Sequence, residues 1–136
     1  MTRLLTGFAL AGVLATGSAF AHHAATTLGT VTITQPVMAG GTTLQPGTYE
    51  LRDTGEHPKP LPGQSADAQA YVEFVSNGTV AAREIAEVMP GARDVVGTSG
   101  GASRARVERL RGDEFLRVSV NHNGERYLVH LPMQAK

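Results

Sequence analysis

One segment of the sequence matches the motif of a serine nucleophile. Gly97-Thr98-Ser99-Gly100-Gly101 fits G-x-S-x-G letter by letter, a pattern that exposes a reactive serine between a buried strand and a helix. Here the motif falls in a glycine-rich connector, which we expect over residues 89–102, and a β-strand follows it. Because the strand–turn–helix context is absent from the sequence pattern, we interpret the motif as a flexible linker.

The first residues have the three parts of a secretory signal peptide. Met1-Thr2-Arg3 is a short basic start, Leu4 to Thr16 is mostly apolar, and Ala19-Phe20-Ala21 is a small-x-small cleavage site. The apolar run is too short to span a membrane. We therefore expect residues 1–21 to be removed, leaving one β domain over residues 22–136 that is periplasmic or secreted and has no transmembrane span.

Cleavage at that site would place two histidines at the new N-terminus. His22 would then carry the free α-amine beside its own imidazole and that of His23, and such nitrogen ligands suit Cu(II). A third ligand would come from His57, His122 or His130, which the sequence does not bring together. Periplasmic copper binding through His22 and His23 is therefore one alternative. The other is a mobile histidine pair that follows the signal peptide by chance and binds no metal.

Arginines near the C-terminus are the third group of chemistry-bearing residues. Their forked N–H donors match carboxylate and phosphate, and basic side chains outnumber acidic ones after Ser103 but not before it. These arginines can act together only if the strands that carry them turn them to one face.

Two turn signals organise Ser103 to Leu131 into a three-stranded meander. Asn123-Gly124 lies between two β-rich runs and is the strongest short hairpin signal. A two-residue loop there pairs His122 with Glu125, and the ladder continues to Leu116 opposite Leu131. Gly112-Asp113 is a weaker turn that pairs Glu108 with Arg117.

This register separates apolar from polar side chains, because successive residues of a strand point to opposite faces. The apolar face carries Leu116, Val118, Val120, Tyr127, Val129 and Leu131. The polar face carries the candidate anion-binding residues Arg104, Arg106, Arg117, Arg126 and His130, around Ser119 and Asn121 and with Glu108 as the main acid.

Clustered positive charge attracts anions, so the sequence predicts an anionic partner for this face: an envelope glycan, a lipid head group or an acidic protein. The alternative is a solvated face balanced by acidic residues elsewhere, or one covered by the loop expected over residues 53–69. Nucleic acid is not expected, because the chain without Arg3 has a net charge of about −1 and the face lacks stacking aromatics.

The remaining sequence predicts further short strands. Runs from Val31 to Thr34, Thr48 to Arg52 and Tyr71 to Ser76 are rich in β-branched and aromatic residues, and Asn77-Gly78 is a second hairpin signal. The run from Ala81 to Val88 fits either a strand or a helix. Pro46-Gly47 suits a type II turn with glycine at positive φ. We expect an all-β fold, a small antiparallel sandwich or barrel of about seven to eight strands built from consecutive hairpins.

One of these hairpins has a known counterpart. Gly41-Thr42-Thr43-Leu44-Gln45-Pro46-Gly47-Thr48-Tyr49-Glu50-Leu51 resembles the G-x-x-L-P-A-G-x-Y hairpin of small exported bacterial β proteins, most of them uncharacterised. It departs from that pattern at Gln45-Pro46. The resemblance implies a β fold and an envelope location, and it implies no catalytic or binding residue.

No pair of carboxylates is placed in a pocket by the sequence. Glu84 with Glu87, Asp113 with Glu114, and Asp53 with Glu56 are only close in sequence. The chain also has no cysteine, so its core alone must stabilise the fold. We therefore expect a non-catalytic binding or accessory module without a cofactor, with the copper protein as alternative and a small envelope hydrolase or isomerase as the third reading.

Overall fold

The computed structural model describes residues 24–90 and 105–134, and all their regular structure is β. This confirms the predicted all-β class. The nine strands are β1 (Thr26–Ile33), β2 (Val37–Ala39), β3 (Thr42–Leu44), β4 (Gly47–Asp53), β5 (Gln69–Ser76), β6 (Thr79–Pro90), β7 (Ala105–Arg109), β8 (Phe115–His122) and β9 (Glu125–Pro132).

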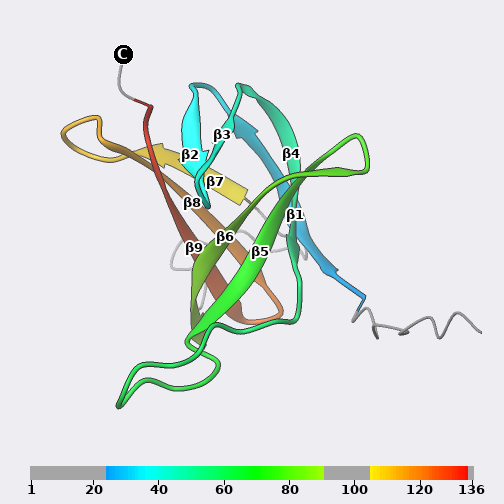
Figure 1. The fold of residues 1–136 in the computed structure, drawn as a ribbon, viewed down its shortest axis with the longest axis vertical. Coiled ribbons are helices and arrows are strands. Elements are labelled where there is room, and N and C mark those ends of the chain that lie inside the picture. The colour runs from blue at the N-terminus through cyan, green and yellow to red at the C-terminus, as the bar shows by residue number, and fades with distance from the viewer. Residues whose placement is uncertain (1–23, 91–104, 135–136) are drawn as a thin grey trace, which may run out of the picture.

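Seven of the strands form one antiparallel sheet in the order β1-β4-β5-β6-β9-β8-β7. The sheet curls until β1 lies beside β7 and β8, which gives a nearly closed barrel (Figure 1). Because the directions of seven strands alternate, β1 and β7 run the same way along this seam. The choice that the sequence left open between sandwich and barrel is thus settled in favour of the barrel.

The meander of β7, β8 and β9 has the predicted register. His122 pairs with Glu125, Leu116 with Leu131 and Glu108 with Arg117. Asn123 and Gly124 have φ of 48° and 79°, as a type I′ turn requires. The β7–β8 turn differs from the prediction: the Asp113 N–H donates to the Leu110 carbonyl at 3.1 Å, so Arg111-Gly112 is the centre of the turn. The strand register is the predicted one, because this longer loop keeps the same residues of β7 and β8 opposite one another.

Strand β6 resolves the segment that fitted either a strand or a helix. It extends from Thr79 to Pro90 after an Asn77-Gly78 turn, with a bulge where Phe74 pairs with Ala82 and Val75 with Val80. The connector expected over residues 89–102 does not include Met89 and Pro90, because they pair with β9, and the rest of it lies outside the described residues. The long loop spans residues 54–68, since its two expected end residues belong to β4 and β5.

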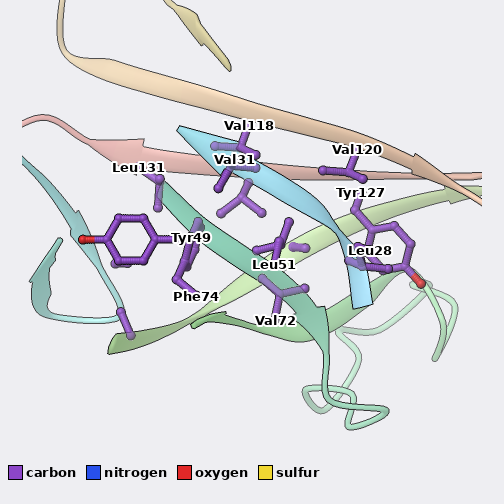
Figure 2. Close-up of a cluster of buried hydrophobic side chains, with 14 of the residues drawn as sticks. Leu28, Val31, Tyr49, Leu51, Val72, Phe74, Val118, Val120, Tyr127 and Leu131 are labelled. Atoms are coloured by element: carbon purple, nitrogen blue, oxygen red, sulfur yellow. The ribbon is translucent and has the colours of Figure 1, made fainter. Parts of the chain in front are cut away.

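The barrel interior is filled by alternate residues of every strand, and no polar side chain is fully buried there within the described ranges. The ring of Tyr49 meets Phe74 edge-on with centroids 6.3 Å apart, and its hydroxyl donates to the Gln45 carbonyl at 2.7 Å. Full burial of a leucine or valine contributes about 1.5–3 kcal/mol. Figure 2 labels Leu28, Val31, Leu51, Val72, Phe74, Val118, Val120 and Leu131 of this cluster, which also includes Val129.

The β2–β3 hairpin lies against β6 and β9 where these two strands are no longer paired. Val37 forms a bridge with Met133, and the Gly40 N–H donates to Glu84 Oε2 at 2.7 Å. Gly40 has φ of 54°, and a Cβ there would lie 2.0 Å from the Arg83 carbonyl oxygen. The close approach of the β2–β3 turn to β6 therefore requires glycine at position 40. The type II turn predicted at Pro46-Gly47 is wrong, because Gly47 has no positive φ and begins β4 opposite Ile33.

Candidate anion-binding face

The outer surface of β7, β8 and β9 carries the polar side chains that the register predicted. The inner residues of these strands fill the core, so their neighbours in sequence point outward. We call this surface the arginine face and define it by Arg106, Glu108, Arg117, Arg126 and His130. Arg104, the fifth predicted basic residue, lies outside the residues that the structure describes, as do His22 and His23.

Two of the arginines hold one carboxylate between them. Arg106 Nε lies 2.9 Å from Glu108 Oε1, and Arg117 Nη2 lies 2.6 Å from Glu108 Oε2. The hydrogen bond from Arg117 lowers the pKa of Glu108, and the charge of Arg106 adds to the effect. We call these three residues the Glu108 clamp.

The clamp leaves donor groups open to water. The Arg106 side chain is 75% exposed, and within the described part of the chain its guanidinium forms an ion pair with no carboxylate other than Glu108. Arg117 is 39% exposed, and exposed His130 lies opposite it on β9. The geometry therefore suits a second anionic group at the outer side of the clamp.

Arg126 belongs to a separate part of the face. It pairs with Asn121, four residues along β8 from Arg117, which corresponds to about 13 Å of strand. Its Nε donates to Asn121 Oδ1 at 3.0 Å, and its strand neighbour on the other side is Met89 of β6. The structure thus brings Arg106 and Arg117 together as predicted and sets Arg126 apart.

The long loop does not cover the arginine face. Its backbone hydrogen bonds to the barrel go to β5 and β6. The Thr54 N–H donates to the Tyr71 carbonyl at 3.0 Å, and the Val88 N–H donates to the Ala68 carbonyl at 2.9 Å. Glu56 forms an ion pair with Arg83, whose guanidinium lies 4.2 Å from the centre of the Tyr71 ring. From these anchors the loop extends beyond the end of the barrel (Figure 1).

A polar contact across the barrel was missed by the sequence reasoning. The Tyr127 hydroxyl donates to Asp53 Oδ2 at 2.8 Å, and Glu125 Oε2 lies 3.3 Å from the Tyr127 hydroxyl oxygen. Burial raises the pKa of Tyr127, and the neighbouring Asp53 carboxylate raises it further. A phenol that stays neutral is a hydrogen-bond donor, so we assign this contact a structural role.

The carboxylates that are close in sequence have different surroundings in the structure. Glu84 is bonded to the Gly40 N–H, whereas Glu87 points to the outer face. Asp53 is turned to Tyr127 while Glu56 is paired with Arg83. Asp113 is paired with Arg109 at 3.6 Å.

The remaining histidines are also dispersed. His57 is bonded to the Gln69 carbonyl at 2.7 Å, His122 contacts Asn123, and His130 is on the arginine face. Residues 24–90 and 105–134 contain no group of three or more His, Cys, Asp or Glu arranged to hold a metal ion. They also contain no helix of the length and hydropathy needed to cross a membrane.

The chain is thus a small antiparallel β-barrel, and on its outer surface two arginines hold the carboxylate of Glu108. No family model, curated protein or solved structure matches the chain.

Proposed function

We propose that the protein is a non-catalytic binding or accessory module of the bacterial envelope, periplasmic or secreted, which binds an anionic partner through the arginine face. The observation that carries the proposal is the Glu108 clamp. Two guanidinium groups on neighbouring strands lie at the spacing that grips a carboxylate. A carboxylate or phosphate of a partner would meet the same donors from the outer side.

The rigidity of the strands supports this proposal. Arg106 and Arg117 project from a paired β7–β8 ladder, which fixes the spacing of their backbones, so no backbone freedom remains to be lost on binding. Hydrogen bonds to charged groups contribute about 1.5–3 kcal/mol each. Two such contacts at one anionic group would dominate the affinity, with His130 at the edge of the site and Arg126 beyond it.

Three anionic probes distinguish the classes of partner. We would measure binding of the protein to a sulfated glycan, to vesicles containing phosphatidylglycerol and to polyglutamate, each at low and at physiological salt. A partner held by the clamp should bind more weakly at high salt, and the double variant Arg106→Glu/Arg117→Glu should lose it. If the double variant bound all three probes as tightly as the wild type does, the proposal would be refuted.

A further inference from the structure

A row of apolar side chains lies on the outer surface beside the arginine face. Ile85 and Met89 of β6 are 37% and 39% exposed. Leu128 of β9 pairs with Glu87, which lies between those two residues on β6, and Tyr71 of β5 pairs with Ile85. The register places these four apolar residues on one outer surface across three strands, with Leu128 diagonal to both Ile85 and Met89. Glu87 lies between Ile85 and Met89 on β6, and Arg83 lies against the Tyr71 ring. We call the four apolar residues the apolar stripe: Tyr71, Ile85, Leu128 and Met89.

Two opposite charges flank the stripe on a diagonal. Glu87 pairs with Leu128, and Arg126 pairs with Met89, so Glu87 and Arg126 occupy two opposite corners of a four-residue block and Leu128 and Met89 the other two. Residues at such diagonal positions are about 7–8 Å apart. They form no ion pair with each other, because Arg126 turns its Nε toward Asn121. Glu87 is exposed and has no ion pair in the described ranges.

This block is complementary to itself. When two identical faces meet about a two-fold axis that follows the Leu128–Met89 diagonal, each of these apolar side chains meets its own copy. The same rotation places Glu87 over Arg126 of the other molecule, and Arg126 over its Glu87. An isologous contact requires this kind of match, in which one patch supplies both halves.

From this match we propose that the apolar stripe is the contact surface of a homodimer whose partner is a second copy of this chain. An anionic partner would be repelled by Glu87 at one corner of the block, whereas a second copy pairs this charge. The Glu108 clamp lies on β7 and β8, outside the block, so it would stay accessible in the dimer. The inference does not rest on the proposed function.

The stripe has few residues, and small interfaces give weak, reversible complexes. The dimer should therefore form as the protein concentration rises and dissociate on dilution. Sedimentation velocity and light scattering on the protein expressed from its full sequence would measure this equilibrium. A monomer at every concentration up to about 1 mM would overturn the inference. The dissociation constant would then exceed about 1 mM, which corresponds to a binding free energy of less than about 4 kcal/mol.

Charge reversal tests the geometry. Glu87→Arg and Arg126→Glu should each place like charges together and weaken the dimer tenfold or more, and the double variant should restore it. Glu114→Arg is the matched control for Glu87→Arg, since it makes the same charge change in the β7–β8 loop, outside the block, and should leave the dimer unchanged. Met89→Glu should abolish the dimer while the melting temperature stays near that of the wild type.

The outcomes separate cleanly. A dimer that survives both single reversals, or that the double reversal fails to restore, would refute this surface as the interface. Glu87→Arg and Met89→Glu change no residue of the arginine face. Anion binding should therefore persist in these two variants, so the two proposals can fail independently.

Discussion

The hydroxyl of Tyr127 donates a 2.8 Å hydrogen bond to the carboxylate of Asp53, which lies 74 positions earlier in the chain. The bond joins β9 to the end of β4 at the margin of the buried cluster, where the Tyr127 oxygen is visible (Figure 2). Glu125 lies within 3.3 Å of the same hydroxyl. A phenol has one proton to donate, so the two carboxylates cannot both be satisfied by it.

Removal of that hydroxyl should destabilise the barrel. Tyr127→Phe leaves Asp53 without its donor while the ring stays packed, and we expect a loss of about 1–2 kcal/mol in the free energy of unfolding. Urea unfolding would measure it. Tyr71→Phe is the control, because the Tyr71 ring is engaged by Arg83 through its face. Equal stability of Tyr127→Phe and the wild type would show that the bond contributes nothing.

The same tyrosine predicts a dependence on alkaline pH. Its pKa is raised above the ordinary value of 10.0, first by burial and then by Asp53, so the folded state holds the proton more tightly than the unfolded state. The stabilisation is fully present below pH 10 and declines as the pH rises through the folded pKa. The free energy of unfolding should therefore fall more steeply above pH 10 in the wild type than in Tyr127→Phe. Parallel curves would contradict this assignment.

The β2–β3 turn offers a test of close packing. Gly40→Ala would direct a methyl group into the Arg83 carbonyl, 2.0 Å away, whereas a methyl group at Gly41 has no atom within 4 Å. Both glycines have positive φ, 54° at Gly40 and 81° at Gly41, so both variants place alanine in the left-handed region. We expect Gly40→Ala to cost about 1–3 kcal/mol more than Gly41→Ala, as measured by chemical denaturation. The reverse order would mean that the hairpin can move away from β6.

The meander could be predicted in detail from sequence because its information is local. Asn123-Gly124 sets a two-residue loop, and alternation then fixes the partner of every residue from Leu116 to Leu131. The position of Arg106 and Arg117 on one face follows directly. Their joint grip on Glu108 depends on rotamers, which alternation does not specify.

Other features depend on contacts that no local pattern records. The segment after Ala81 has helical propensity, but pairing on both sides with β5 and β9 makes it a strand. The prolines that follow Asp53 predict a loop there, and strand alternation predicts a core position for its partner Tyr127. Only the closure of the barrel brings these two residues together.

Glu108 should compete with an external anion for the clamp. Glu108→Gln removes the internal carboxylate charge, and exposed ion pairs contribute up to about 1 kcal/mol, so we expect affinity for the sulfated glycan to rise about two- to fivefold. Glu114→Gln makes the same charge change in the β7–β8 loop and should have a smaller effect. An affinity that falls in Glu108→Gln would indicate that Glu108 positions the arginines instead of blocking them.

The most direct test of the binding proposal compares two double variants of equal net charge. Arg106→Glu/Arg117→Glu destroys the clamp, whereas Lys59→Glu/Arg111→Glu reverses two charges on loops and leaves the clamp intact. Titration of both with the probe that binds the wild type best would give their affinities. We expect a loss of at least a hundredfold in the first variant and only a small change in the second. Equal losses in both would mean that net charge alone attracts the anion and that the arginine face is not a site.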